Sequence, residues 1–165
     1  MRYNGLAALP PPAHPRGHMN GTTSGRIWTI WAGGGLVTNF AWEMLQMPLY
    51  GKFEGGWWRC FQASLGDVII LAVLYALMAC ADEDWIWFRR LSLWRLSLLS
   101  ALGFLIAVLI EQRALATGAW TYQAEMTRVP FLGVGWSPVL QMILIPLGLA
   151  GLSRFWALRG GRVHA

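Results

Sequence analysis

Four stretches of the chain are apolar over a length that suits a membrane-spanning helix, for which a bilayer requires about 20 residues. The expected helices cover residues 27–47, 64–81, 96–118 and 138–158, of which the second is the shortest and most apolar. The composition agrees, because 56% of the residues are hydrophobic and 13% are charged. These patterns predict an all-α integral membrane protein of one domain, a four-transmembrane-helix bundle over residues 26–158.

The two ends of the chain and two internal segments lack such apolar runs. Residues 1–25 hold four prolines and several glycines without apolar periodicity, which predicts a disordered tail. Residues 159–165 form a short basic tail. Residues 50–63 and 118–136 are expected to be two long loops on the outer side of the bundle. Loops of this length in a small domain often bind ligands or cover a site, and aromatic residues in them equally suit an anchor at the membrane interface.

The cations divide unequally between the two sides of this arrangement, and cytoplasmic segments of membrane proteins carry an excess of Lys and Arg. With a cytoplasmic N-terminus, nine arginines lie on the inner side and four cations on the outer side. We therefore expect both tails in the cytoplasm and the protein in the cytoplasmic (inner) membrane of a bacterium. The inner cations are Arg2, Arg16, Arg26, Arg89, Arg90, Arg95, Arg154, Arg159 and Arg162, and the outer ones are Lys52, Arg59, Arg113 and Arg128.

A polar stripe interrupts the first apolar stretch. Asn39, Glu43 and Gln46 are spaced i, i+4, i+7, so they share one face of a helix. An ionisable side chain is costly in such a segment, and it usually faces the protein interior, a partner or a water-filled cavity. We therefore predict that Glu43 is buried inside the bundle.

Each of the other expected helices also carries a polar residue near its outer end. Asp67 lies near the outer start of the second helix, Glu111 near the outer end of the third, and Gln141 near the outer start of the fourth. Together with Glu43 they form one polar layer. We interpret this layer as a site close to the extracytoplasmic surface.

Three members of the layer also have structural interpretations. Asp67 follows Ser64 in an S-x-x-D pattern, which is typical of a capping box at a helix start. Glu111 is close enough in sequence to pair with Arg113. Gln141 alone is as well suited to a hydrogen bond between helices. These alternatives stay open at the level of the sequence.

Two carboxylates that meet in a low dielectric cannot both stay ionised cheaply, so one is expected to hold a proton. We take Glu43 and Glu111 as a candidate acid/base pair, with Glu43 as the acid. A shared proton suits acid catalysis, proton-coupled transport or a structural hydrogen bond. The candidate ligand-binding residues are the remaining residues of the polar stripe and of the layer, and three aromatic residues of the last outer loop: Asn39, Gln46, Asp67, Trp120, Tyr122, Trp136 and Gln141.

Several chemistries do not fit the sequence. His14, His18 and His164 lie in the tails, which leaves no imidazole in the expected bundle for haem, zinc or a Ser-His dyad. There is no phosphate-binding loop and no dinucleotide fingerprint. We expect no cofactor and no metal. The net charge of +5 is explained by topology, so we expect no nucleic-acid partner.

Two resemblances bear on function. In size and number of spans the chain resembles small multidrug transporters, in which a membrane glutamate carries the proton. The fragment EMLQMP, residues 43–48, resembles a glutamate-glutamine-proline stretch of sterol isomerase-like membrane proteins. Neither resemblance covers more than one helix, so no residue role follows from it.

Three function classes stay open. The bundle binds, and by proton transfer modifies, a lipid- or isoprenoid-like small molecule; or it is a proton-coupled small-molecule transporter; or it is a non-catalytic assembly subunit of a membrane complex. The expected partners are membrane lipids, a hydrophobic small molecule, and a second copy of the chain or another membrane protein. Since the sequence contains no nucleophile motif, whether the protein is an enzyme is undecided.

Overall fold

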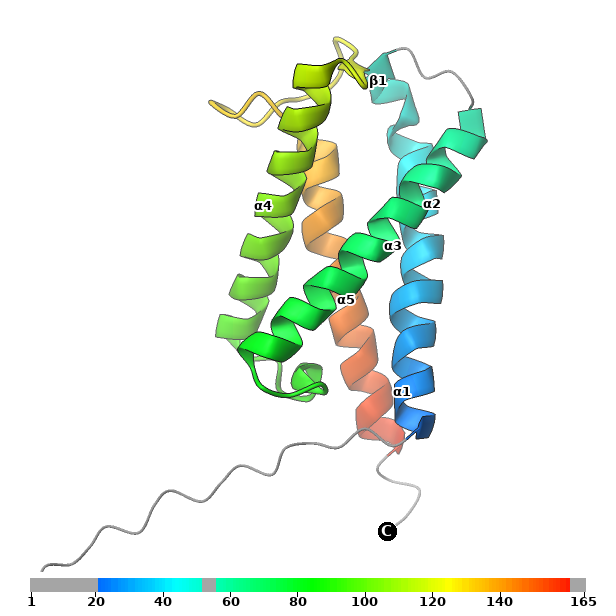
Figure 1. The fold of residues 1–165 in the computed structure, drawn as a ribbon, viewed down its shortest axis with the longest axis vertical. Coiled ribbons are helices and arrows are strands. Elements are labelled where there is room, and N and C mark those ends of the chain that lie inside the picture. The colour runs from blue at the N-terminus through cyan, green and yellow to red at the C-terminus, as the bar shows by residue number, and fades with distance from the viewer. Residues whose placement is uncertain (1–20, 52–55, 161–165) are drawn as a thin grey trace, which may run out of the picture.

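Three long apolar helices dominate the structure. The computed structural model describes residues 21–51 and 56–160, most of which are helical. The long helices are α3 (Gly56–Ala81), α4 (Leu93–Thr117) and α5 (Trp136–Gly160) (Figure 1). By length and composition each can cross a membrane, which is consistent with the predicted all-α membrane protein.

The N-terminal helical run consists of consecutive pieces instead of the single helix expected over residues 27–47. They are α1 (Gly21–Trp28), the π-helical η1 (Thr29–Gly34), α2 (Gly35–Gln46) and the 3-10 helix η2 (Met47–Leu49). In Figure 1 α1 and α2 lie in line as one rod. Residues 21–25, expected in a disordered tail, instead begin α1. Residues 1–20 and 161–165 of the two predicted tails, with all three histidines, lie outside the described residues.

Helix α3 starts at Gly56 and not at the expected residue 64. Ser64 therefore lies inside the helix, where its hydroxyl donates to the Cys60 carbonyl oxygen at 2.7 Å. The predicted capping box of Ser64 and Asp67 is wrong, because there is no helix start at Ser64. The apolar-run criterion missed the first turns of α3 because they carry polar and aromatic residues. Helices α4 and α5 begin within three residues of the expected starts at 96 and 138.

The two segments expected as outer loops meet in a short antiparallel ladder. Strand β1 (Tyr50–Gly51) follows η2, and β2 (Thr121–Tyr122) follows the end of α4. Tyr50 lies opposite Tyr122. The ladder lies at one end of the helices, and the beginning of α1 and the end of α5 lie at the other (Figure 1). We call these the ladder end and the terminal end.

The terminal end is filled by aromatic side chains. Trp31, Tyr75, Trp87 and Phe88 are buried in one hydrophobic cluster with residues of α4 and α5. The Trp31 indole nitrogen donates to the Ser153 hydroxyl at 3.0 Å, which ties η1 to α5. The short helix η3 (Trp87–Arg90) contributes two of these rings. The interior here is therefore packed and apolar.

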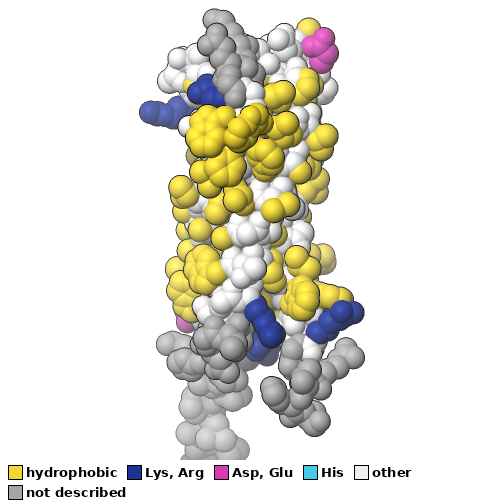
Figure 2. Space-filling view, turned by 90° about the vertical axis from the view of Figure 1, so that its right-hand side faces the viewer, with side chains coloured by type: hydrophobic (Ala, Val, Ile, Leu, Met, Phe, Trp, Pro, Cys, Tyr) yellow, Lys and Arg dark blue, Asp and Glu magenta, His cyan; other side chains and the backbone are white. Residues whose placement is uncertain are grey.

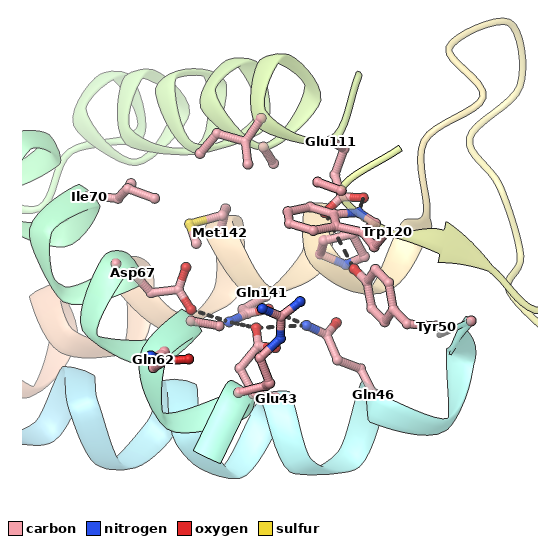
Figure 3. Close-up of a pocket in the computed structure, with 18 residues that line it drawn as sticks. Glu43, Gln46, Tyr50, Gln62, Asp67, Ile70, Glu111, Trp120, Gln141 and Met142 are labelled. Carbon is pink, nitrogen blue, oxygen red and sulfur yellow. Dashed lines mark hydrogen bonds between the residues drawn. The ribbon is translucent and has the colours of Figure 1, made fainter. Parts of the chain in front are cut away.

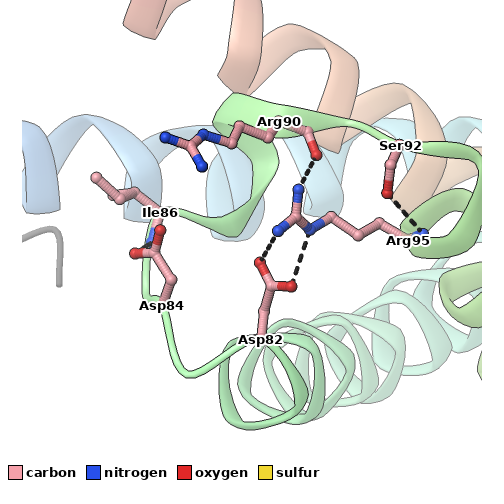
Figure 4. A network of polar contacts seen from close by, with 6 residues as sticks. All are labelled: Asp82, Asp84, Ile86, Arg90, Ser92 and Arg95. Carbon is pink, nitrogen blue, oxygen red and sulfur yellow. Dashed lines mark hydrogen bonds and ion pairs between the residues drawn. The ribbon is translucent and has the colours of Figure 1, made fainter. Parts of the chain in front are cut away.

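An ion pair fixes the connection between α3 and α4 at the terminal end. The Arg95 guanidinium contacts both carboxylate oxygens of Asp82, at 2.7 Å and 2.9 Å (Figure 4). Arg95 also donates to the Arg90 carbonyl oxygen. Ser92 caps α4 by accepting from the Arg95 backbone N–H at 3.4 Å. This network closes the turn by polar contacts that involve none of the site candidates.

The outer surface of the helices is apolar. Hydrophobic side chains gather along the face in Figure 2, and Lys and Arg side chains lie near its two ends. Large apolar residues point outward from each long helix, for example Ile69, Leu109 and Leu144. A soluble protein rarely exposes so much contiguous apolar surface, and lipid is the solvent that suits it.

Helix α4 packs on α5 through a glycine. A Cβ atom at Gly103 would lie 2.1 Å from the Met142 carbonyl oxygen, so the two backbones meet where no side chain fits. On the other side of the bundle, a Cβ at Gly35 of α2 would lie 2.7 Å from a methyl group of Leu71 on α3. Small residues allow this close approach of helices in lipid.

We expect Gly103→Ala to destabilise the fold, because the added methyl group must push α5 away from α4. Overpacking of this kind costs about 1–3 kcal/mol. The matched control is Gly148→Ala on α5, where an added Cβ meets nothing within 4 Å. Thermal unfolding of the detergent-solubilised variants, followed by circular dichroism, should show a lower midpoint for Gly103→Ala alone. Equal midpoints would contradict the close α4–α5 contact.

Candidate functional site

A cavity of about 490 Å³ lies among α2, α3, α4 and α5 next to the β1–β2 ladder. This volume lies in the range of small-molecule sites, roughly 300–1,000 Å³. Polar side chains line one part of it and apolar side chains another (Figure 3). The lining residues are Glu43, Gln46, Tyr50, Gly51, Arg59, Gln62, Ala63, Gly66, Asp67, Ile70, Ala107, Ile110, Glu111, Ala119, Trp120, Pro138, Gln141 and Met142.

One side-chain amide, that of Gln141 on α5, connects three helices. Its nitrogen lies 3.0 Å from a carboxylate oxygen of Glu43, 3.0 Å from one of Asp67 and 2.9 Å from the Asn39 amide oxygen. Gln46 adds two more bonds, because its nitrogen donates to Glu43 at 2.8 Å and to the Gln141 oxygen at 3.0 Å. Figure 3 shows Glu43, Gln46 and Asp67 converging on Gln141. We call these five residues the amide–carboxylate network.

The Gly35 carbonyl oxygen determines the orientation of each side-chain amide in this network. The Asn39 nitrogen donates to the Gly35 carbonyl oxygen at 2.8 Å, so the Asn39 oxygen faces Gln141 and requires a donor. The Gln141 nitrogen supplies it, which turns the Gln141 oxygen toward the nitrogen of Gln46. The Gln46 oxygen then accepts from the Ser137 hydroxyl at 2.7 Å. Reversing one amide would place two donors or two acceptors against each other.

The network has fewer donors than acceptors. The Gln141 nitrogen carries two hydrogens but has three acceptors within bonding distance, two of them carboxylates. The other oxygen of Glu43 and the other oxygen of Asp67 make no hydrogen bond in residues 21–51 and 56–160. Both residues line the cavity. The polar part of the cavity is therefore rich in unused acceptors.

Glu111 belongs to a second cluster, on the ladder side of the cavity. One of its oxygens accepts from the Tyr50 hydroxyl at 3.3 Å, and the other accepts from the Trp120 indole at 3.2 Å and from the Tyr122 hydroxyl. The Tyr122 oxygen in turn accepts from the Gly135 N–H at 2.8 Å. We call Glu111 with Tyr50, Trp120 and Tyr122 the aromatic–carboxylate cluster. It fastens to α4 the two segments that contain β1 and β2, which we call the outer segments because they lie beyond the ends of the helices.

Both tyrosines of this cluster remain donors over a wide pH range. Burial raises the pKa of Tyr50 above its ordinary value near 10, and the negative charge of Glu111 raises it further. Burial and the hydrogen bond to Glu111 likewise raise the pKa of Tyr122. Since both folded-state pKa values lie above the unfolded value, each hydroxyl keeps its proton below about pH 10 and loses it only as the pH rises through the folded-state pKa.

The structure divides the predicted site residues into two groups and leaves one outside. Asn39, Glu43, Gln46, Asp67 and Gln141 share the amide–carboxylate network, and Glu111, Trp120 and Tyr122 share the aromatic–carboxylate cluster. Trp136 begins α5, is 38% exposed, and is not part of the cavity wall.

Glu43 and Glu111 line the same cavity, but in the described parts of the chain no hydrogen bond joins the two carboxylates. The proposed pairing of Glu111 with Arg113 is wrong, because aromatic donors occupy the Glu111 carboxylate. The interhelical hydrogen bond considered for Gln141 is present, since its amide bonds to α2 and α3. The acid/base assignment stays a prediction.

Sequence reasoning missed four residues of the site. Arg59 and Gln62 lie in the first turns of α3 and line the cavity with Asp67, at a spacing of i, i+3, i+8 that is a helical face. That spacing could have extended the predicted helix toward its true start. Tyr50 and Ser137 had no such signal, because their partners are 61 and 91 residues away along the chain.

Compared with protein-family models, curated proteins and solved structures, the chain matches none. Its function is therefore argued from the site itself. In the described parts of the chain, no group of three or more His, Cys, Asp or Glu side chains is arranged to hold a metal ion. The three cavity carboxylates are instead separated by amides and aromatic rings.

Gln141→Leu should destabilise the protein, because it removes the donor shared by Asn39, Glu43 and Asp67. A buried polar group left without a partner costs about 1–3 kcal/mol. The matched control is Gln112→Leu on the exposed side of α4. We expect a clearly lower unfolding midpoint for Gln141→Leu than for Gln112→Leu. Identical midpoints would mean that the network contributes no net stability.

Tyr122→Phe should loosen the outer segments, because it removes a bond to a carboxylate and the acceptor of the Gly135 N–H. Bonds to charged groups contribute about 1.5–3 kcal/mol. Tyr50→Phe, which loses one bond of 3.3 Å to Glu111, is the comparison variant. Hydrogen–deuterium exchange of residues 119–135 should accelerate more in Tyr122→Phe than in Tyr50→Phe. The reverse order, or no change in either, would contradict the role given to Tyr122.

Proposed function

We propose that the protein is a multi-pass membrane protein that binds a lipid-like small molecule in this cavity. The observation that carries the proposal is the combination of unused carboxylate oxygens and an apolar wall in one cavity. Ile70, Ala107 and Met142 supply part of the apolar wall. An amphiphile satisfies both parts at once, since its polar end and its hydrocarbon need different surroundings.

The polar end of this ligand would be a hydrogen-bond donor. Glu43 and Asp67 offer free acceptor oxygens, and both already share the nitrogen of Gln141. An ammonium group or a hydroxyl group complements them, whereas a carboxylate would be repelled. A cationic head would also relieve the repulsion between the two acids. We therefore propose a long-chain amine or alcohol, a class that includes isoprenoid alcohols.

The topology proposed with this function has four crossings and cytoplasmic termini. The helical run over residues 21–46 would be the fourth crossing, since at about 1.5 Å per residue it is roughly 39 Å long, longer than a hydrocarbon core of about 30 Å. Cations on the segments of the terminal end support a cytoplasmic position for that end. They are Arg26, Arg89, Arg90, Arg95, Arg154 and Arg159. The site would then face the extracytoplasmic side, and a bacterial inner membrane stays a prediction.

Binding is a better account of the cavity than proton-coupled transport. A transported ligand needs a polar path on both sides of its site. Toward the terminal end, Trp31, Tyr75, Trp87 and Phe88 fill the interior. Proton transfer to the bound molecule by Glu43 remains a further step that this geometry permits, because Glu43 has an oxygen free to meet a ligand.

The test uses three probes of equal chain length, namely hexadecylamine, hexadecanol and hexadecanoate. Native mass spectrometry of the purified protein should show the amine and the alcohol bound and the carboxylate bound least. Glu43→Gln and Asp67→Asn should each weaken amine binding about tenfold, because each replaces an acceptor oxygen of the cavity by an amide NH₂ donor. Glu125→Gln, in the exposed outer segment, is the matched control. Binding of none of the three probes would overturn the proposal and favour the assembly subunit, and equal binding of all three would overturn the donor head group.

A further inference from the structure

We infer that the cavity opens sideways between α3 and α4 into the hydrocarbon of the bilayer, so that its ligand enters from the membrane and not from water. This inference rests on the proposed function for the nature of the ligand. The direction of the opening rests on the structure alone. Three observations support this direction, namely the exposure of the cavity wall, the residues that flank its mouth and the packing of the helices.

The cavity wall is buried on one side and exposed on the other. On α2 and α5, Glu43, Gln46 and Gln141 are at most 9% exposed. On α3, Gln62, Ala63 and Gly66 are exposed, and on α4 the facing Ile110 is 37% exposed. The mouth of the cavity therefore lies along the seam between α3 and α4.

Lipid-facing side chains flank this mouth on both helices. Leu65 and Ile69 are exposed on α3, and Leu105 and Leu109 are exposed on α4. All four lie inside helices that are apolar and long enough to cross a membrane. An opening between two such surfaces meets acyl chains. Arg59, which lies nearer the ladder end and also lines the cavity, marks the rim at the level of the headgroups.

The packing of the helices leaves this seam open. Helix α4 packs mainly on α5 and α2 mainly on α3, through the close glycine contacts at Gly103 and Gly35. Small residues stand at the seam itself, Ala63 and Gly66 on α3 and Ala107 on α4. A Cβ at Gly66 would meet nothing within 4 Å, in contrast to Gly103. The α3–α4 seam is therefore less tightly packed than the α4–α5 and α2–α3 contacts.

The occupant of the gap is the hydrocarbon chain of an amphiphile dissolved in the bilayer. Asp67 adjoins Gly66 in the sequence and lines the cavity, so a donor head group bonded to Asp67 would leave its chain at the mouth. Gln62 lies along the mouth and would contact the head group during entry. A water-soluble ligand would not enter favourably between apolar flanks, because its polar groups would lose their hydrogen bonds to water there.

A spin label at the mouth tests the direction of the opening without any ligand. In a chain with Cys60→Ala and Cys80→Ala, Gly66→Cys is labelled with a nitroxide and the protein is reconstituted in phospholipid vesicles. We expect collisions with oxygen, which dissolves in lipid, to exceed collisions with a water-soluble nickel chelate. Glu125→Cys, in the exposed segment after β2, is the water-exposed comparison. Dominant access of the nickel chelate to residue 66 would overturn the sideways opening even if the protein binds amphiphiles.

A bulky side chain at the mouth tests entry itself. With hexadecylamine supplied in the vesicle membrane, Gly66→Trp should reduce protein loading, measured by native mass spectrometry after a fixed time, to less than about a tenth of wild type. Gly148→Trp, on α5 away from the cavity and also without neighbours within 4 Å, should load normally. Normal loading of Gly66→Trp would overturn the entry route and leave the binding function intact. If wild type fails to bind the amine while the label reports lipid access, the proposed function fails and the opening stands.

Discussion

The shortage of hydrogen-bond donors in an apolar interior is the constraint on which this structure depends. Inside lipid, each polar side chain must find its partner within the protein. The amide nitrogen of Gln141 on α5 lies within hydrogen-bond distance of three acceptors, two on α2 and one on α3. A rotation or shift of any of these helices would leave a carboxylate or an amide unpaired, at a cost of the order of 1–3 kcal/mol. The network therefore fixes how α2, α3 and α5 face one another.

Helix α4 contributes no side chain to that network, so the network does not draw α4 toward α3, and the cavity lies between them. Helix α4 is held by Gly103 against α5 and by Glu111 against the two outer segments. Neither contact requires α4 to fill the space beside Asp67. The polar group that α4 contributes is Glu111, whose carboxylate already accepts hydrogen bonds from Tyr50, Trp120 and Tyr122. Glu111 therefore holds the outer segments in place. The free acceptors of the cavity are therefore carboxyl oxygens of Glu43 and Asp67.

The sequence predicted those parts of the structure that have a local signal. The i, i+4, i+7 spacing of Asn39, Glu43 and Gln46 placed them on one face, and they do share a network. Apolar length predicted four membrane helices, and three of them are long apolar helices in the structure, but the predicted start of α3 was too late, because Arg59 and Gln62 were assigned to a loop. The pairing of Tyr50 with Tyr122 depends on a contact between distant segments, which no local pattern encodes. Ser64 shows the converse, since a capping motif can occur inside a helix that starts earlier.

The asymmetry between the two ends bears on what a ligand can do once bound. At the ladder end Glu43 and Asp67 each have a carboxyl oxygen that makes no hydrogen bond within the described residues. At the terminal end the Trp31 indole donates a hydrogen bond to Ser153, and aromatic rings fill the remaining space. A molecule with a donor head group would gain hydrogen bonds by entering beside Asp67 and would lose all of them by moving further toward the terminal end. Such a gradient holds a ligand at one depth, with its chain still among the lipids. Under the proposed function, the arrangement would therefore retain an amphiphile at one depth and would not carry it across the membrane.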